Sequence, residues 1–124
     1  MRKVILIAED EPYVTEVIKA MSDEIGDFDT IEAENGAQLI DLAEKSKPDL
    51  IITDIIMPDM DAYHAVAKLK KNPEFRDTPV IFESAVMKDI SVFETLKPEG
   101  RCIFLIKPFK FEELSQAIKQ LLGE

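Results

Sequence analysis

Polar residues with charged or reactive side chains stand at the ends of four short apolar runs. They are Glu9 and Asp10, Asp54, Ser84 and Lys107. The acids could bind a divalent cation, and an aspartate in that company could act as the nucleophile that forms an aspartyl phosphate. The lysine supplies a positive charge and the serine a hydroxyl donor, both suited to phosphoryl oxygens. These residue types predict phosphoryl chemistry, provided that the fold brings them together.

The donor atoms indicate which metal such a site would hold. Two carboxylates within about 5 Å repel by roughly 3 kcal/mol at an effective dielectric of about 20, so a cluster of acids needs a cation. The sequence has one histidine and one cysteine, too few for a zinc cluster. Oxygen donors favour magnesium, or manganese in its place.

The apolar runs predict a parallel sheet. Val4–Ala8, Leu50–Ile52, Val80–Phe82 and Cys102–Ile106 are apolar without alternation, as strands covered on both faces are. Phe28–Ala33 alternates in part and suits an edge strand. Because ligands of such sheets bind beyond the carboxyl ends of the strands, the polar residues that follow the runs should meet at one edge.

Helical spacing of apolar residues separates the runs, so strand and helix alternate in a three-layer α/β domain. The predicted helices begin at Pro12, span Gly36–Ser46, cover Ala62–Leu69, span Val86–Lys97 before Pro98, and cover Phe111–Leu122. Asn35 should cap the second helix, and Pro12 suits a first helical turn.

Length and charge limit the class of protein. A chain of 124 residues predicts one domain over residues 1–124. Its 15 basic and 25 acidic residues give a net charge of −10, which disfavours direct binding to nucleic acid or to an anionic membrane. No apolar run approaches the roughly 20 residues of a membrane span, and the single cysteine suits a reducing compartment. We therefore expect a cytoplasmic protein.

Four segments together resemble the receiver domain of two-component response regulators. They are Ile5–Pro12, Asp54–Asp61, Ser84-Ala85 and Lys107–Phe109. Each is common alone, but their order at the ends of successive strands is specific, and the resemblance covers essentially the whole chain. It implies a flavodoxin-like fold, a five-stranded parallel sheet in the order 2-1-3-4-5 with five helices.

The resemblance also implies a role for each residue at the metal site. Asp54 would be the phosphoacceptor. Glu9, Asp10, Asp54 and the backbone carbonyl of Ile56 would hold the magnesium ion.

Other positions would bind and report the phosphoryl group. Ser84 and Lys107 would contact its oxygens, and Ser84 would move toward it while Phe104 turns inward behind. The Lys107-Pro108 bond is a candidate for the cis form, which proline alone makes accessible.

The resemblance implies partners as well. The donor would be a phosphohistidine on a histidine kinase or a phosphotransfer protein. The output would be a downstream protein target or a fused output domain, and a homodimer could form on phosphorylation. Such a domain is not an enzyme beyond catalysing its own phosphorylation and dephosphorylation.

The sequence departs from the family's pattern at a few positions. Ala62 stands where glycine is usual, and we expect a negative φ there. Glu83 replaces an apolar residue; strand alternation points it away from Ser84, and we expect it to be solvated. Ile56 and Val86 flank the path of the hydrolytic water and cannot orient it, which predicts a long-lived phosphoryl group.

Three rival functions share parts of this pattern. A flavin binder would need a Ser/Thr/Gly-rich loop after the first strand, where this chain has Glu9-Asp10-Glu11. An aspartate-nucleophile phosphatase would place a second aspartate at position 56, which is Ile56. A pseudo-receiver that binds partners without phosphorylation is not excluded by the motifs.

Overall fold

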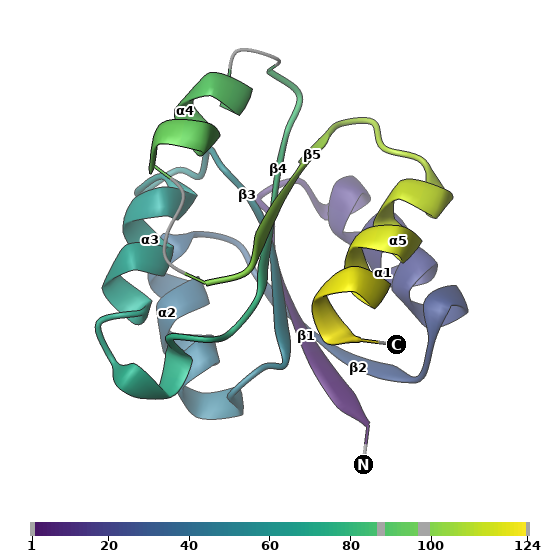
Figure 1. Cartoon of the computed structure of the whole chain (residues 1–124), viewed down its shortest axis with the longest axis horizontal. Coiled ribbons are helices and arrows are strands. Elements are labelled where there is room, and N and C mark those ends of the chain that lie inside the picture. Colours follow the sequence, from purple (N-terminus) through teal and green to yellow (C-terminus); the bar gives the residue numbers. More distant parts are fainter. Residues whose placement is uncertain (1, 87–88, 97–99, 124) are drawn as a thin grey trace.

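The computed structural model describes residues 2–86, 89–96 and 100–123 and contains the predicted sheet (Figure 1). Its strands are β1 (Lys3–Ala8), β2 (Phe28–Ala33), β3 (Leu50–Asp54), β4 (Val80–Ser84) and β5 (Cys102–Ile106). All pair in parallel, in the order β2-β1-β3-β4-β5. The predicted fold class and strand order are confirmed.

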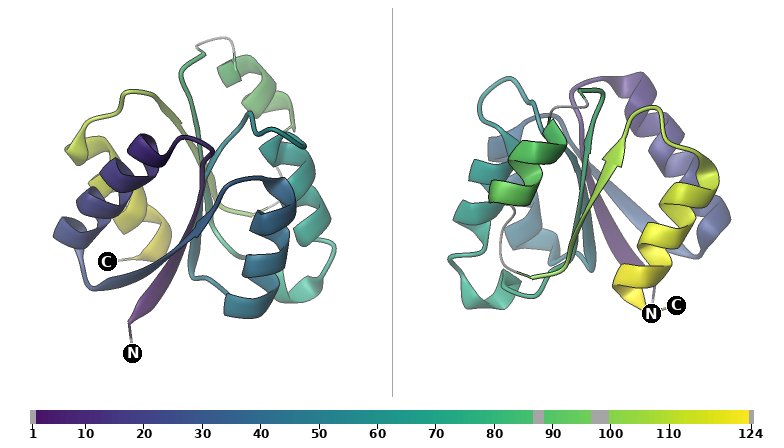
Figure 2. Two further views of the ribbon diagram at one scale, coloured as in Figure 1. Left: turned by 180° about the vertical axis from the view of Figure 1, so that it is seen from behind. Right: turned by 45° about the horizontal axis from the view of Figure 1, so that its top comes forward.

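Five helices cover the two faces of the sheet. They are α1 (Pro12–Ile25), α2 (Gly36–Ser46), α3 (Ala62–Leu69), α4 (Asp89–Leu96) and α5 (Phe111–Leu122), and a short 3₁₀ turn, η1 (Pro73–Phe75), follows α3. Helices α1 and α5 lie on one face, and α2, α3 and α4 lie on the other (Figures 1 and 2).

The predicted helix start at Val86 is wrong, because this residue lies in the loop after β4 and α4 is described from Asp89. The Val86 backbone N–H donates to the Ser84 hydroxyl oxygen at 3.1 Å. The predicted helix end at Lys97 and Pro98 lies outside the described residues.

Alternate residues of each strand enter separate apolar layers, as pleating requires. On β1, Leu6 and Ala8 pack in the layer under α2, α3 and α4, whereas Ile5 and Ile7 pack in the layer under α1 and α5. All four are fully buried. A polar residue on a central strand therefore faces one of two covered layers, never open solvent.

The predicted starts of α1 and α2 are present. Pro12 opens α1, and the Asn35 side chain accepts the Gln38 N–H at the start of α2. Asp61 caps α3 by accepting the His64 N–H at 2.9 Å. Among the described residues other than glycine, only Lys47 has a positive φ, so the expected negative φ at Ala62 is confirmed.

The loop between β3 and α3 is fastened to the start of α2. The Asp59 carboxylate accepts the backbone N–H groups of Gly36 at 2.8 Å and Ala37 at 2.9 Å. These donors hold the pKa of Asp59 below its ordinary value. A Cβ at Gly36 would clash with the Met60 side chain, so glycine permits this close approach. The contact anchors the loop that follows Asp54.

Candidate functional site

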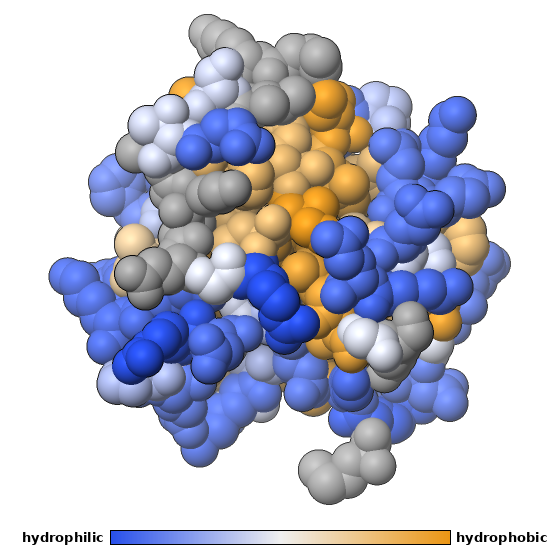
Figure 3. All heavy atoms as spheres, viewed as in Figure 1, coloured by the Kyte–Doolittle hydropathy of each residue, from blue (hydrophilic) through white to orange (hydrophobic). Residues whose placement is uncertain are grey.

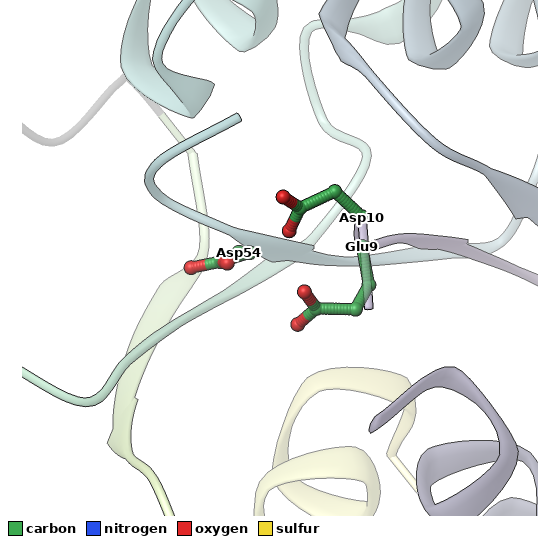
Figure 4. Close-up of side chains that lie close together, drawn as sticks. All are labelled: Glu9, Asp10 and Asp54. Atoms are coloured by element: carbon green, nitrogen blue, oxygen red, sulfur yellow. The ribbon is translucent and has the colours of Figure 1, made fainter. Parts of the chain in front are cut away.

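Three acids meet at the carboxyl edge of the sheet (Figure 4). Glu9 and Asp10 follow β1, and Asp54 ends β3. Each offers a carboxylate oxygen, and these oxygens all lie within 4.8 Å of one another. Glu9 is buried, Asp54 is half-buried and Asp10 is exposed. The predicted proximity of the acids is therefore present.

Strand register explains why these side chains converge. Ile7 pairs with Ile52, so Glu9 and Asp54 occupy equivalent positions two residues farther along neighbouring strands. Asp54 in turn pairs with Glu83 on β4. By strand alternation all of these acids point to the face that α1 and α5 cover.

Lys107 links the cluster to the last strand. Its Nζ lies 2.9 Å from Glu9 Oε1, 3.5 Å from Asp54 Oδ2 and 3.5 Å from Glu83 Oε1. Burial alone would lower the pKa of Lys107, but the surrounding carboxyl groups raise it above its ordinary value. The Lys107-Pro108 bond is cis, as expected.

The acids of the cluster differ in how readily they ionise. Burial and the neighbouring Glu9 raise the pKa of Asp54 to about 6, although Lys107 opposes them. Burial would raise the pKa of Glu9 too, but contacts with Glu83 and Lys107 bring it below its ordinary value. Without a bound cation, the ionised form of Asp54 is thus less favourable than that of an ordinary aspartate.

The expectation that Glu83 is solvated is wrong, because the side chain is completely buried. Strand alternation does turn it away from Ser84, but that face is the layer under α1 and α5. Burial, and next the neighbouring Glu9, raise the pKa of Glu83 to about 9. The strand register places Glu83 and Lys107 on the same face of the sheet as Glu9 and Asp54. Strand alternation counted from these residues could therefore have revealed this fourth acid from the sequence.

Ser84 is buried and bonded to the start of α4. Its hydroxyl donates to Asp89 Oδ2 at 2.6 Å. Its proton is therefore engaged by a neighbouring helix, and sequence reasoning did not anticipate that partner.

Phe104 lies half-buried on the edge strand β5, at the end of a row of aromatic rings. Its ring centroid is 5.6 Å from that of Phe93, which is 5.9 Å from Phe82. Phe82 is 5.0 Å from Tyr63 on α3. Contact between rings thus runs from α3 through β4 and α4 to β5.

The residues fit a hard divalent cation. Three oxygen donors converge, and a polar pocket of about 220 Å³ adjoins Glu9 and Asp10 on the side of β2, without Asp54 in its lining. Magnesium keeps several water molecules when it binds to carboxylates, and the exposed Asp10 leaves the cluster accessible to water. The backbone carbonyl of Ile56 remains a predicted ligand. The Ile56 residue is 61% exposed.

Comparisons with known proteins agree with this geometry. The sequence model of the response regulator receiver domain matches residues 5–119. The chemotaxis protein CheY of Bacillus subtilis is 31% identical over 119 residues, covering 96% of this chain and 97% of that protein. The response regulator Rre1 of Synechocystis is 34% identical, covering 96% of this chain and 51% of that protein.

A solved structure is similar in fold and in sequence. The receiver domain of the sensor histidine kinase PA1611 of Pseudomonas aeruginosa, which has magnesium in its active-site cleft, superposes with a TM-score of 0.86 at 27% identity, covering 100% of both chains.

The parallel sheet with acids at its carboxyl edge and a lysine directly after its last strand defines a CheY-like receiver fold. This chain belongs to the response regulator receiver domain family of two-component systems. It spans about half the length of the first curated relatives that it matches and nearly all of CheY. Every helix within residues 2–86, 89–96 and 100–123 is too short or too polar to cross a bilayer.

Proposed function

We propose that this receiver domain accepts a phosphoryl group on Asp54 in a magnesium-dependent transfer. The convergence of Glu9, Asp10 and Asp54 within 4.8 Å, with Lys107 Nζ 3.5 Å from Asp54 Oδ2, carries the proposal. A cation at the three acids would neutralise charge on the entering phosphoryl group and favour ionised Asp54.

The chain's own residues have separate tasks in the transfer. An oxygen of the Asp54 carboxylate attacks phosphorus in line, an O–P bond forms, and the bond from phosphorus to the donor's nitrogen or acyl oxygen breaks. Lys107 offsets charge on the phosphoryl oxygens. The Ser84 hydroxyl, bonded to Asp89 beforehand, turns to a phosphoryl oxygen once the group is in place.

Named relatives support partners on both sides of this step. Rre1 and CheY are regulators, and one further relative, 33% identical over 121 residues, is a histidine kinase of Formosa agariphila of which this chain covers 9%. The donor would be a phosphohistidine on a kinase or phosphotransfer protein in the cytoplasm. The receiver would then act on a downstream protein, a fused output domain or a second copy of itself.

The surface that would carry the signal lies along β5. Figure 3 shows apolar side chains gathered between α4 and α5, with polar side chains on either side. Four of the five residues of β5 are half-buried, Phe104 among them. An inward turn of Phe104 against Phe93 would alter this surface, which is how the phosphoryl state would reach a partner.

The lifetime of the phosphoryl group would be long. Ile56 and Val86 flank the site and carry no polar atom that could orient an attacking water. The alternative of a pseudo-receiver is not supported, since the acids and the lysine that the family uses are all present and adjacent.

Intact-mass measurement with acetyl phosphate tests the proposal. With magnesium we expect a gain of one phosphoryl group, labile to hydroxylamine, that is absent in Asp54→Asn and with a chelator.

Two further measurements use the same assay. Manganese in place of magnesium tests whether the second metal supports the transfer. The loss of the phosphoryl group after removal of the donor should be faster in Ile56→Asn or Val86→Glu than in the wild type. An adduct that persists in Asp54→Asn would overturn the assignment of the phosphoacceptor.

A further inference from the structure

Glu83 is a buried carboxyl group that the proposed transfer does not use. It lies on β4, between β3 and β5, near the carboxyl end of the strand, and is 0% exposed. Within the part of the chain that the structure describes, neither of its oxygens has a hydrogen-bond partner. A buried polar group without a hydrogen bond destabilises a fold relative to an apolar residue of similar size. Its place beside the acid cluster therefore calls for a reason other than stability.

Lys107 is the positive group that Glu83 faces. The distance from Lys107 Nζ to Glu83 Oε1 is 3.5 Å, equal to its distance from Asp54 Oδ2. Glu9 Oε1 is nearer, at 2.9 Å. Lys107 donates a hydrogen bond to Glu9 Oε1, whereas its 3.5 Å separations from Asp54 and Glu83 are ion-pair contacts.

The three carboxyl groups near Lys107 differ in how far their side chains are exposed to solvent. The side chains of Glu83 and Glu9 are 0% and 1% exposed, whereas that of Asp54 is 13% exposed. The Asp54 side therefore opens toward the place where a phosphoryl group would be attached. Glu83 contacts the ammonium from within the protein.

The separations between carboxylate oxygens set Glu83 apart from the candidate metal ligands. Among the described residues, the acids whose oxygens lie within 4.8 Å of one another are Glu9, Asp10 and Asp54, without Glu83. The geometry thus groups Glu83 with Lys107 rather than with the three candidate metal ligands.

We propose that Glu83 is a positioning residue for Lys107: its buried carboxyl group holds the ammonium from the interior, fixed beside Asp54 before a phosphoryl group arrives. Ordering a lysine side chain costs conformational entropy. With Glu83 in place, that ordering occurs on folding rather than on phosphoryl binding. The consequence for phosphorylation rests on the proposed function, but the ordering of Lys107 belongs to the unphosphorylated chain.

Two substitutions of Glu83 separate positioning from packing. Glu83→Gln keeps a polar oxygen that faces Lys107, whereas Glu83→Leu keeps a similar volume and removes that oxygen. A matched control is Ile81→Val, which removes one methylene from the same face of β4 at a fully buried position two residues away. Because leucine suits an apolar layer, Glu83→Leu should melt at or above the wild-type temperature.

The first measurement is ¹H–¹⁵N NMR of the lysine ammonium groups in the unphosphorylated protein. We expect a slowly exchanging ammonium signal, assigned to Lys107 by its absence in Lys107→Met. It should persist in Glu83→Gln and Ile81→Val and broaden beyond detection in Glu83→Leu. The second measurement is the initial rate of phosphorylation by acetyl phosphate and magnesium, which should fall roughly tenfold in Glu83→Leu and less than twofold in Glu83→Gln.

The outcomes discriminate between the proposals. A Lys107 signal that survives in Glu83→Leu overturns the positioning role. The positioning role is also overturned if Ile81→Val loses the Lys107 signal and the phosphorylation rate as much as Glu83→Leu does while both variants melt at the same temperature. If the signals behave as expected while the wild type gains no phosphoryl group, the positioning role stands and the proposed function fails.

Discussion

Asp54 has a pKa of about 6 in the folded chain against 3.8 ordinarily, chiefly because burial and then Glu9 disfavour its charge. A carboxyl whose pKa rises on folding binds its proton more tightly in the native state. Its contribution to stability therefore falls as pH rises from about 4 to about 6. A shift of about 2 units corresponds to about 1 to 3 kcal/mol at neutral pH without metal.

Asp54→Asn should consequently stabilise the metal-free protein. We expect its free energy of unfolding to exceed that of the wild type by about 1 to 3 kcal/mol at pH 7, with the difference vanishing toward pH 4. Urea unfolding in the presence of a chelator, from pH 4 to 7.5, measures this. Asp41→Asn, on the exposed side of α2, is the control and should show no such trend. A difference independent of pH would contradict the argument.

At the scale of elements, β4 and α4 are joined by the hydrogen bond from Ser84 to Asp89. In the proposed transfer, this bond would compete with the phosphoryl group for the serine hydroxyl. Removing the acceptor should release the hydroxyl, so Asp89→Ala should accelerate phosphorylation by acetyl phosphate about threefold to tenfold, which corresponds to the roughly 0.7 to 1.4 kcal/mol of an ordinary hydrogen bond.

The comparison variants sharpen this test. Asp89→Asn retains a weaker acceptor and should fall between Asp89→Ala and the wild type. Ser91→Ala changes an exposed side chain on the same helix and should leave the rate unchanged. A slower rate in Asp89→Ala would mean that the bond to Ser84 prepares the site rather than competing with it.

How far the sequence predicts this molecule depends on the element. Unbroken apolar runs identify the central strands, and caps such as Asn35 and Pro12 mark helix starts, because both signals are local. The start of α4 was missed because a turn through Ser84 and Val86 uses side-chain hydrogen bonds that periodicity does not encode. Glu83 was misread because its burial depends on which helices cover each face, a property of the assembled layers.

At the scale of the whole molecule, a net charge of −10 and an acid cluster both oppose compactness. Magnesium can relieve them in two ways, by screening and by binding. At 10 mM it should raise the melting temperature by about 3 to 10 °C, through preferential binding to the folded state. Differential scanning calorimetry measures the shift.

Controls separate binding from screening. Sodium chloride of the same ionic strength should give a much smaller shift, because it screens without occupying the acid cluster. Asp10→Asn removes an exposed ligand at little structural cost and should lose most of the magnesium effect. Equal shifts with both salts would count against a specific site.

The two ends of the chain share one side of the molecule. Strand β1 begins at the amino edge of the sheet, and α5 ends there, where the Arg101 guanidinium donates to the Leu121 carbonyl at 2.5 Å (Figure 2). Glu9, Asp10 and Asp54 lie at the opposite edge. A fluorophore or an immobilising tag grafted onto either end would consequently leave the approach to Asp54 unobstructed, so docking of the proposed phosphoryl donor could be followed by surface-based methods without shielding this carboxylate.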